Sequence, residues 1–456
     1  MLDLEVCRLL KEYASGYKNQ TVGFVGMGVS NLPVIRLFAS VGAKCTVRDK
    51  KDLSGSDFYP ELIDLGVEFI IGEGYLDDIT ETLLFLSPAV RPDLEGLNKA
   101  REKGTRITSE MEEFFNLCPC KIIAITGSDG KTTTTTLISK LLTEAGYKTW
   151  LGGNIGVNLF ATLDEIKAND FAVVELSSFQ LMKLAKSPDV AVITNVAPNH
   201  LDWHKDMQEY VDAKKRIFEF QNENSLLVLN ADDEYCKSFI QDAKGNVRTV
   251  SGKSSDTDFY FDENGIYDKN GNMLVKDEEI RIIGKHNRYN YTEAYCAVSQ
   301  YVAKETLKKV ALEFGGVEHR IEFVRELNGV KYYNSSIDSS PSRTEACVNS
   351  FKDKPIVISG GYDKNIPYEP LGDLFKNKVK YAVLCGATAN KIAVVLDSVG
   401  FNDYCIVDEF ETAVMTAKEK ANDGDSIVLT PASASFDMFK NFAERGNVFK
   451  KIVNSL

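Results

Sequence analysis

Long hydrophobic runs are absent from this sequence: no window reaches about 18 consecutive apolar residues, the length that crosses a bilayer. The N-terminus also lacks the charged segment and apolar stretch of a secretory leader. Basic runs are absent too, and the formal net charge is −13 at pH 7. This charge argues against a nucleic-acid partner, because phosphate backbones are held by excess lysine and arginine. We therefore expect a soluble cytoplasmic protein without membrane insertion.

Cysteine and histidine are sparse. The nine cysteines are scattered, and Cys118 and Cys120, which lie close together, have no second pair at the spacing of a metal-binding finger. Reduced thiols of a cytosolic protein fit this pattern best. The four histidines all lie in short polar clusters, at positions 200, 204, 286 and 319. With 44% hydrophobic residues the composition is that of a globular protein, and 456 residues suffice for about three domains of roughly 150 residues each.

The first 110 residues open with a β-α-β pattern. An apolar strand over Thr21–Val25 ends in the glycine turn Gly26-Met-Gly-Val-Ser-Asn31, and a helix and a second strand, Cys45–Arg48, follow. Amide groups at such a helix start suit a pyrophosphate, and Asp49 lies where such folds meet a ribose or base. Asn31 stands where a dinucleotide fingerprint has its third glycine, so a purely structural turn stays open. Further strands are expected at 68–71, 83–86 and 106–108.

A second unit begins with the pattern of a phosphate-binding loop. An apolar strand over 121–125 leads into Gly127-Ser-Asp-Gly-Lys-Thr132 and a helix-like run. The two glycines let amide groups converge on phosphate oxygens, Lys131 supplies a charge for the outer phosphates, and the Thr132 hydroxyl can bind magnesium. Ile125 stands where a standard Walker loop has glycine, so the loop is a shorter variant. ATP is the first hypothesis, and a turn that binds nothing is the alternative.

Acidic and basic side chains follow the next strands of this unit. The strand Phe171–Glu175 delivers Glu175 to its end, and the strand over 190–195 leads to His200. Ligands of open parallel sheets lie outside the carboxyl ends of the strands, so both side chains should share an edge with Lys131. Glu175 and Thr132 could then hold magnesium, which prefers a few oxygen ligands and shares the phosphates. A helix cap or a surface carboxylate is the alternative for Glu175.

Other polar residues of the second unit have more than one interpretation. His200 could be a core histidine, or could pair with His204 on zinc. Lys214 lies on a helical stretch whose default interpretation is a solvated basic face. Asn287 and Asn290 open a helix, where their amides could bind an adenine edge or could simply cap the helix.

A third α/β unit is expected from about Arg320 as strand, helix and strand, after an antiparallel hairpin region over 253–279. Arg320 could reach phosphate or ribose. The segments Gly360–Lys364 and Thr430–Phe442 follow strands and offer hydroxyl and cationic groups to a carboxylate-bearing substrate, although each could be an ordinary turn. Buried strands are expected at 355–359, 380–384 and 426–429.

Together these motifs resemble the Mur ligase family over essentially the whole chain. The segments that carry the resemblance are 26–31, 87–88, 126–132, 153–156, 175–180, 195–202, 286–287, 319–320, 360–364 and 433–446. The resemblance implies three α/β domains: a Rossmann-like domain over 1–110 for a UDP-sugar, a P-loop ATPase-like domain with a parallel sheet over 111–315 for ATP, and a Rossmann-like domain over 316–456 for an amino acid. It implies a monomeric, ATP-dependent ligase that adds D-glutamate to UDP-N-acetylmuramoyl-L-alanine through an acyl phosphate.

The resemblance also implies roles for individual residues. Those implied in catalysis are Lys131, Glu175, His200 and Lys214. Those implied for ATP are Gly127, Ser128, Asp129, Gly130, Lys131, Thr132, Thr133, Asn287, Asn290 and Arg320. Those implied for the other substrates are Gly28, Val29, Ser30, Asp49, Lys50, Ser87, Asn154, Ser177, Ser339, Lys364, Ser435, Phe436 and Phe442. Two magnesium ions are implied, one at Thr132 and Glu175 and one at His200 and Lys214. A protonated lysine would repel magnesium, so carbamylation of Lys214 to N6-carboxylysine is physically sensible.

Two departures from the family pattern stand out. Ser335 replaces an acidic residue expected to help hold ATP, and Asp338 is a candidate substitute. Ala89 replaces the glycine that commonly follows Ser87-Pro88, which questions the phosphate contact of that turn. The alternatives are another ATP-dependent amino-acid ligase, including one for a folate-like carboxylate, a non-catalytic nucleotide-binding regulator, and a dinucleotide oxidoreductase.

Overall fold

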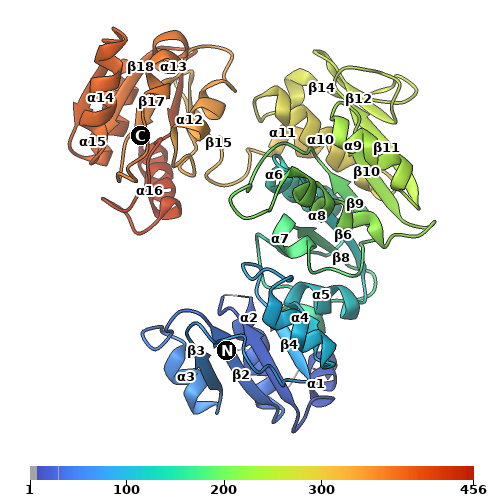
Figure 1. The fold of residues 1–456 in the computed structure, drawn as a ribbon. Coiled ribbons are helices and arrows are strands. Elements are labelled where there is room, and N and C mark those ends of the chain that lie inside the picture. The colour runs from blue at the N-terminus through green and yellow to red at the C-terminus, as the bar shows by residue number, and fades with distance from the viewer. Residues whose placement is uncertain (1–7, 29) are drawn as a thin grey trace. The chain divides into compact units, whose positions relative to one another are not determined.

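The computed structural model describes residues 8–28 and 30–456, and within these ranges the strands form three sheets (Figure 1). Parallel pairs dominate all three sheets, and helices alternate with the strands along the chain, which confirms the predicted α/β class. In the described ranges, no helix combines the length and hydrophobicity that crossing a membrane demands.

The first sheet has the strand order β3-β2-β1-β4-β5, and its pairs are parallel. Alternate side chains of β1 enter different cores: Val22 and Phe24 pack with Phe38 of α2, whereas Val25 packs with Leu97 of α4. Helices therefore cover both faces of the sheet. The elements are α1 Arg8–Ser15, β1 Thr21–Val25, α2 Asn31–Ser40, β2 Lys44–Asp49, α3 Tyr59–Asp64, β3 Glu68–Ile71, β4 Leu83–Leu86, α4 Glu95–Glu102, β5 Arg106–Thr108 and α5 Glu110–Leu117.

The middle sheet has the order β14-β13-β12-β11-β10-β9-β6-β8-β7. Strand β6 pairs in parallel with β8 and β9, so the polar ends of these strands lie at one edge. The antiparallel pair β12–β13 confirms the predicted hairpin region. The elements are β6 Lys121–Thr126, α6 Lys131–Glu144, β7 Thr149–Gly153, β8 Phe171–Glu175, α7 Ser178–Leu181, β9 Val190–Ile193, α8 Met207–Glu219, β10 Leu226–Asn230, α9 Glu234–Phe239, β11 Asn246–Ser251, β12 Phe259–Phe261, β13 Gly265–Asp268, β14 Met273–Lys276, α10 Lys285–Val298 and α11 Lys304–Glu313.

The third sheet has the order β15-β16-β20-β17-β18-β19. Its strands also alternate between two cores: Val357 and Val428 pack on one face, and Ile358 and Leu429 on the other. The elements are β15 Glu322–Leu327, β16 Val330–Asn334, α12 Pro341–Val348, β17 Ile356–Ser359, α13 Pro370–Lys378, β18 Tyr381–Cys385, α14 Ala389–Ser398, β19 Tyr404–Val407, α15 Phe410–Lys420, β20 Ser426–Leu429 and α16 Phe442–Ser455.

The expected strand-helix-strand start of the third unit is wrong. Strands β15 and β16 form an antiparallel hairpin instead. Asn328 and Gly329 between them have φ of 52° and 74°, and two such residues make the turn that joins twisted strands in a hairpin. The chain divides into two compact units, one running to Leu274 and including Tyr289–Leu307, the other comprising Val275–Arg288 and Lys308–Leu456. The domain boundaries at 110 and 315 stay predictions.

Candidate active site

The phosphate loop has the backbone that its glycines predict. Gly127 has a φ of +153° and Gly130 a φ of +81°, at the N-cap of α6. A Cβ on Gly127 would lie 1.8 Å from Thr194 Oγ1, so this position has no room for a larger residue. Lys131 Nζ donates to the carbonyl oxygens of Gly127 and Ser128 at 2.9 and 3.0 Å and so lies over the loop. Thr132 and Thr133 follow in the first turn of α6.

Residues after β9 hold the loop in place. Asn195 Oδ1 accepts from Asp129 N at 3.0 Å, and Asn195 Nδ2 donates to Asp129 O at 3.1 Å. Thr194 Oγ1 donates to the same carbonyl at 2.5 Å. Ser128 Oγ shares a hydrogen bond of 2.9 Å with the Tyr210 hydroxyl of α8. The loop backbone is therefore set by side chains that follow β9 and by one side chain of α8, and Tyr210 is a contact that the sequence reasoning missed.

Glu175 ends β8 as predicted and is buried. Its Oε1 accepts from Asn154 Nδ2 at 2.8 Å, whereas its Oε2 has no hydrogen-bond partner among the described residues. A buried carboxylate oxygen without a partner is costly unless a cation or donor completes it, so this atom fits a magnesium ion. Ser177 caps α7 and forms a capping box with Gln180, so its hydroxyl is engaged locally.

His200, Lys131 and Lys214 share one electrostatic environment. His200 has a φ of +55°, and its pKa is lowered first by partial burial and then by the charge of Lys131. Lys214 is 1% exposed, and burial and then the charge of Lys131 hold its pKa well below the ordinary lysine value. Its Nζ lies 4.5 Å from the centroid of the Tyr210 ring. The default interpretation of Lys214 as part of a solvated face is therefore wrong.

Across the described ranges, no three His, Cys, Asp or Glu side chains gather closely enough to hold a metal by themselves. His204 Nε2 shares a hydrogen bond of 2.9 Å with Ser178 Oγ and its Nδ1 lies 3.3 Å from Glu209, so this buried ring faces protein partners on both sides. The zinc alternative for His200 and His204 gains no acidic ligand set. A magnesium ion that shares its coordination with phosphates needs fewer protein ligands.

The glycine turn after β1 packs against the turn after β4. A Cβ on Gly26 would lie 2.4 Å from Ser87 Oγ, so Gly26 is required for this close approach. The space beside Gly28 is open to 4 Å. Ala89 is not among the described residues with positive φ, so alanine fits this turn without the strain that its replacement of glycine suggested.

The other predicted contacts of the UDP-sugar lie around the same turn. Asp49 Oδ2 accepts from Met27 N at 2.8 Å and so braces the glycine turn, while Lys50 is exposed in an ion pair. Ser30 precedes α2 as its N-cap. Val29 lies outside the described residues.

The predicted ATP residues beyond the loop fall in both compact units. Asn290, in the first unit, accepts from Thr134 Oγ1 of α6 at 3.2 Å and lies 2.5 Å from where a Cβ on Gly130 would be. This places Asn290 behind the phosphate loop. Asn287 and Arg320 belong to the second unit, where Asn287 Nδ2 donates to the Ile283 carbonyl at 2.6 Å.

The predicted amino-acid residues lie in loops of the third sheet, except Phe442, which begins α16. Lys364 Nζ and Ser339 Oγ are 3.5 Å apart, so the structure brings these two together. Ser435 is buried, whereas Phe436 and Phe442 are 62% and 40% exposed. The Phe436 ring packs edge-on with Tyr362, and the Phe442 ring packs edge-on with His319.

Asp338, the candidate substitute for the acidic residue missing at position 335, is engaged within the third unit. Its Oδ2 accepts from Thr430 Oγ1 at 3.0 Å, and burial raises the pKa of its carboxyl to about 6. Ser335 Oγ accepts from Ile321 N at 3.1 Å and also faces inward. Both groups are part of the interior of the third unit.

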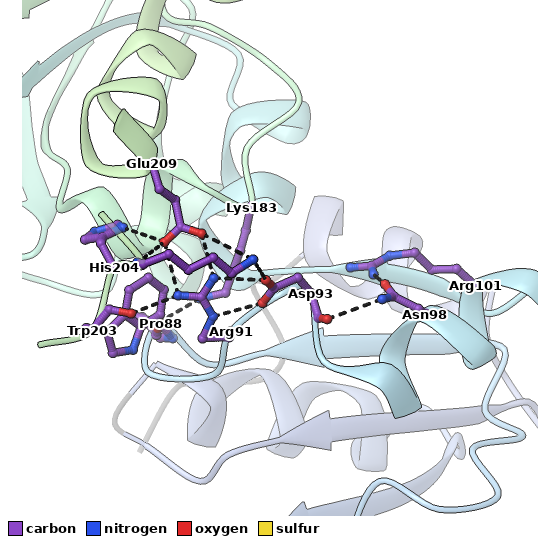
Figure 2. Close-up of polar contacts among 10 residues, drawn as sticks. Pro88, Arg91, Asp93, Asn98, Arg101, Lys183, Trp203, His204 and Glu209 are labelled. Atoms are coloured by element: carbon purple, nitrogen blue, oxygen red, sulfur yellow. Dashed lines mark hydrogen bonds and ion pairs between the residues drawn. The ribbon is translucent and has the colours of Figure 1, made fainter. Parts of the chain in front are cut away.

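The sequence reasoning missed Arg91. Figure 2 shows its guanidinium between Asp93 on the first sheet's side and Glu209 of α8. In the sequence, Arg91 is marked only by its position four residues after Ser87. Its partner Glu209 is 118 residues away in the chain.

A three-sheet α/β fold with a phosphate loop on β6 and an acidic end on β8 defines an ATP-dependent ligase architecture, and the chain belongs to the Mur ligase family. Residues 125–298 match the family model of the Mur ligase middle domain, and residues 319–433 that of the Mur ligase glutamate ligase domain. The UDP-N-acetylmuramoylalanine–D-glutamate ligase of Ruminiclostridium cellulolyticum is 47% identical, with 98% of this chain and 99% of that one covered. The enzyme of that name from Clostridium beijerinckii is 49% identical, with 98% of each covered.

A solved structure is similar over nearly the same length. The UDP-N-acetylmuramate-alanine ligase of Thermotoga maritima matches with a TM-score of 0.58 at 17% identity, covering 96% of this chain and 99% of that one. At this identity the likeness shows the fold alone.

Proposed function

We propose that this chain is an ATP-dependent ligase that joins D-glutamate to UDP-N-acetylmuramoyl-L-alanine in peptidoglycan precursor synthesis. The observation that carries the proposal is the near full-length similarity to ligases of that name, on a chain that keeps the phosphate loop and the buried Glu175. The substrates are small molecules, and we propose that the enzyme works on them in the cytoplasm as a monomer.

The proposed reaction has two steps. The terminal phosphoryl group of ATP passes to the alanyl carboxylate and gives an acyl phosphate and ADP. The amine of D-glutamate then attacks the acyl carbon, loses a proton, and expels inorganic phosphate as the amide bond forms. In this proposal the amides of the loop and Lys131 hold the phosphates, which spreads the charge that develops during transfer.

Two magnesium positions are proposed, one at Thr132 and Glu175 and one at His200 and Lys214. Magnesium would supply charge neutralisation at the phosphates. The unpartnered Oε2 of Glu175 supports the first position, and the lowered pKa of His200, which favours the neutral, ligating form, supports the second. Burial and Lys131 also favour the neutral amine of Lys214, the form whose nitrogen can add to carbon dioxide and lose a proton to give an anionic carbamate.

We propose the remaining contacts as the family resemblance assigns them. Gly28, Ser30, Asp49, Lys50, Ser87, Asn154 and Ser177 would face the UDP-sugar, and Asn287, Asn290 and Arg320 would face ATP. Lys364 and Ser339, which lie together, would bind D-glutamate with Ser435, Phe436 and Phe442.

The test is phosphate release from ATP with UDP-N-acetylmuramoyl-L-alanine and, one at a time, D-glutamate, L-glutamate, D-aspartate, L-alanine and L-lysine. Among these five amino acids, we expect only D-glutamate to support phosphate release. Release with a different amino acid would show another ligase of the family, and release with none would favour a nucleotide-binding regulator. Lys131→Ala should abolish release, whereas the exposed Lys18→Ala should not.

A further inference from the structure

Arg91, Asp93 and Glu209 (Figure 2), together with Lys205, form a cluster of charges that ties the first sheet to the middle sheet. Arg91 Nε and Nη2 donate to the two oxygens of Asp93, both at 2.9 Å. Its Nη2 and Nη1 donate to the two oxygens of Glu209 at 2.7 and 3.2 Å. Lys205 Nζ donates to Asp93 at 2.6 Å. One guanidinium is thus held by a carboxylate from each side, in the forked geometry that favours arginine over lysine.

Arg91 also bonds the backbone of the segment that carries His200. Its Nη1 donates to the Trp203 carbonyl at 2.8 Å. The amides of Trp203 and His204 donate to the His200 carbonyl at 3.1 and 3.0 Å, so Trp203 belongs to the turn that sets the backbone of His200. That turn holds His200 at a φ of +55°, a conformation that non-glycine residues adopt only when their surroundings hold them in it.

A second cation ties the same turn of the first sheet to the segment after β8. Lys183 Nζ donates to the Pro88 carbonyl at 2.7 Å and to the Phe179 carbonyl at 3.2 Å. The turn over 87–93 is therefore bonded to two segments of the middle sheet. One is the segment that follows Glu175, and the other is the segment that precedes α8. Within the middle sheet, His204 joins these segments through Ser178.

We propose that Arg91 is a positioning residue, which fixes the turn that would contact the UDP-sugar at a set distance from the turn that carries His200. This inference rests on the proposed function, because it requires one substrate that spans both turns. The UDP end would bind at the first sheet, and the alanyl carboxylate would have to reach the phosphate loop of the middle sheet. A rigid connection between the two turns places that carboxylate without further ordering.

A surface ion pair would not hold the two turns together in this way, since exposed ion pairs contribute little to stability. The side chains of Arg91 and Glu209 are only 19% and 18% exposed. Arg36 and Glu61 offer a matched comparison: they form the same forked pair, at 2.6 Å in both bonds, but are 44% and 43% exposed and both lie in the first sheet's layer. Removing Arg36 removes an arginine-glutamate pair without touching the connection between the sheets.

The experiment compares wild type, Arg91→Gln, Glu209→Gln and Arg36→Gln. For each, calorimetry measures the Kd of UDP-N-acetylmuramoyl-L-alanine without ATP, phosphate release gives kcat and KM, and urea unfolding checks the fold. For Arg91→Gln we expect kcat to fall roughly 10- to 100-fold, the size of effect that a misplacement of about 1 Å produces. The Kd of the UDP substrate should stay unchanged, and Arg36→Gln should behave as wild type.

The outcomes separate the two proposals. A wild-type enzyme that does not turn over D-glutamate overturns the proposed function. A wild-type enzyme that is active, with an Arg91→Gln variant of unchanged kcat, overturns the positioning role. A loss of kcat together with substrate affinity also overturns it, because Arg91 would then bind substrate or only support the fold. Should Arg91→Gln not fold, Glu209→Gln gives the same comparison.

Discussion

Replacing Gly127 by alanine tests whether the phosphate loop is the working centre of this enzyme. The Cβ would lie 1.8 Å from Thr194 Oγ1 and 3.3 Å from the backbone nitrogen of Asn195. Thr194 is 1% exposed, and its hydroxyl bonds the Asp129 carbonyl at 2.5 Å, so it cannot simply move away. The substitution must therefore displace the loop or break the contact that holds it.

The cost can be worked out from two terms. An alanine at a φ of +153° carries backbone strain of about 1–3 kcal/mol. Rotating Thr194 to avoid the overlap loses a hydrogen bond worth about 1 kcal/mol. The folded loop is thus destabilised by about 2–4 kcal/mol, most of which a shift of the loop can relieve. Such a shift moves the amides away from the phosphates, and about 1 Å of displacement costs roughly 100-fold in rate.

The assay is phosphate release at varied ATP, with urea unfolding in parallel. We expect kcat/KM for ATP to fall about 100-fold in Gly127→Ala. Adding Thr194→Ala should restore part of the loss, because it removes the overlapping oxygen. Gly55→Ala is the control, since nothing lies within 4 Å of its Cβ and its φ is not positive. A Gly127→Ala enzyme with the kcat/KM of this control would refute the reasoning.

Two further predictions concern buried ionisable groups. Burial raises the pKa of Glu110 from 4.5 to about 7, so the folded state keeps a proton that the unfolded chain has lost. This group alone should lower the free energy of unfolding by roughly 3 kcal/mol as pH rises from 4.5 to 7. Burial raises the pKa of Glu112 in the same way, so urea unfolding of Glu110→Gln should show a smaller fall with pH than wild type, whereas the exposed Glu102→Gln should show the full fall. Lys214→Ala should lose turnover, and formate or acetate should restore part of it in phosphate-release assays, because the proposed carbamate acts as a carboxylate. Lys215, which is partly exposed and pairs with Asp242, has no such role, and a failure of rescue would contradict the carbamate.

Much of the fold follows from local patterns. Apolar runs that end in polar residues predicted β3, β4, β5, β8 and β20 at the bounds that the structure has. The predicted strand over 190–195 is too long, because Thr194 and Asn195 leave the ladder's regular pattern to hold the phosphate loop. The β15–β16 hairpin was missed although Asn328-Gly329 is a strong hairpin signal. Strand β7 ends in two glycines, which are unfavourable in strands, so it carried little signal.

The residues of the site also fall into two groups: those that local sequence patterns predict and those that depend on contacts between distant parts of the chain. The phosphate loop and Glu175 lie at strand ends, and His200 lies in the segment that follows β9; a parallel sheet brings such strand ends together whatever the details of packing. The role of Arg91 could not be predicted, because it depends on the contact with Glu209. These two residues are far apart in the sequence, and only the packing of the two sheets brings them together. Tyr210 was missed for the same reason, since its hydroxyl meets Ser128 across the middle sheet's edge.

Lys214 is different, because its burial was present in the sequence as a periodic pattern. Tyr210, Val211, Ile217 and Phe218 are all buried on α8. Lys214 lies four residues after Tyr210, three after Val211, three before Ile217 and four before Phe218. It therefore falls on the same stripe of the helix. The basic neighbours at 215 and 216 suggested a solvated face, but residues one and two apart on a helix do not share a face. A lysine inside an apolar stripe is held in its neutral form, because burial lowers the pKa of its amine. This lowered pKa is the physical reason to look for chemistry at the Lys214 amine rather than for a surface ion pair.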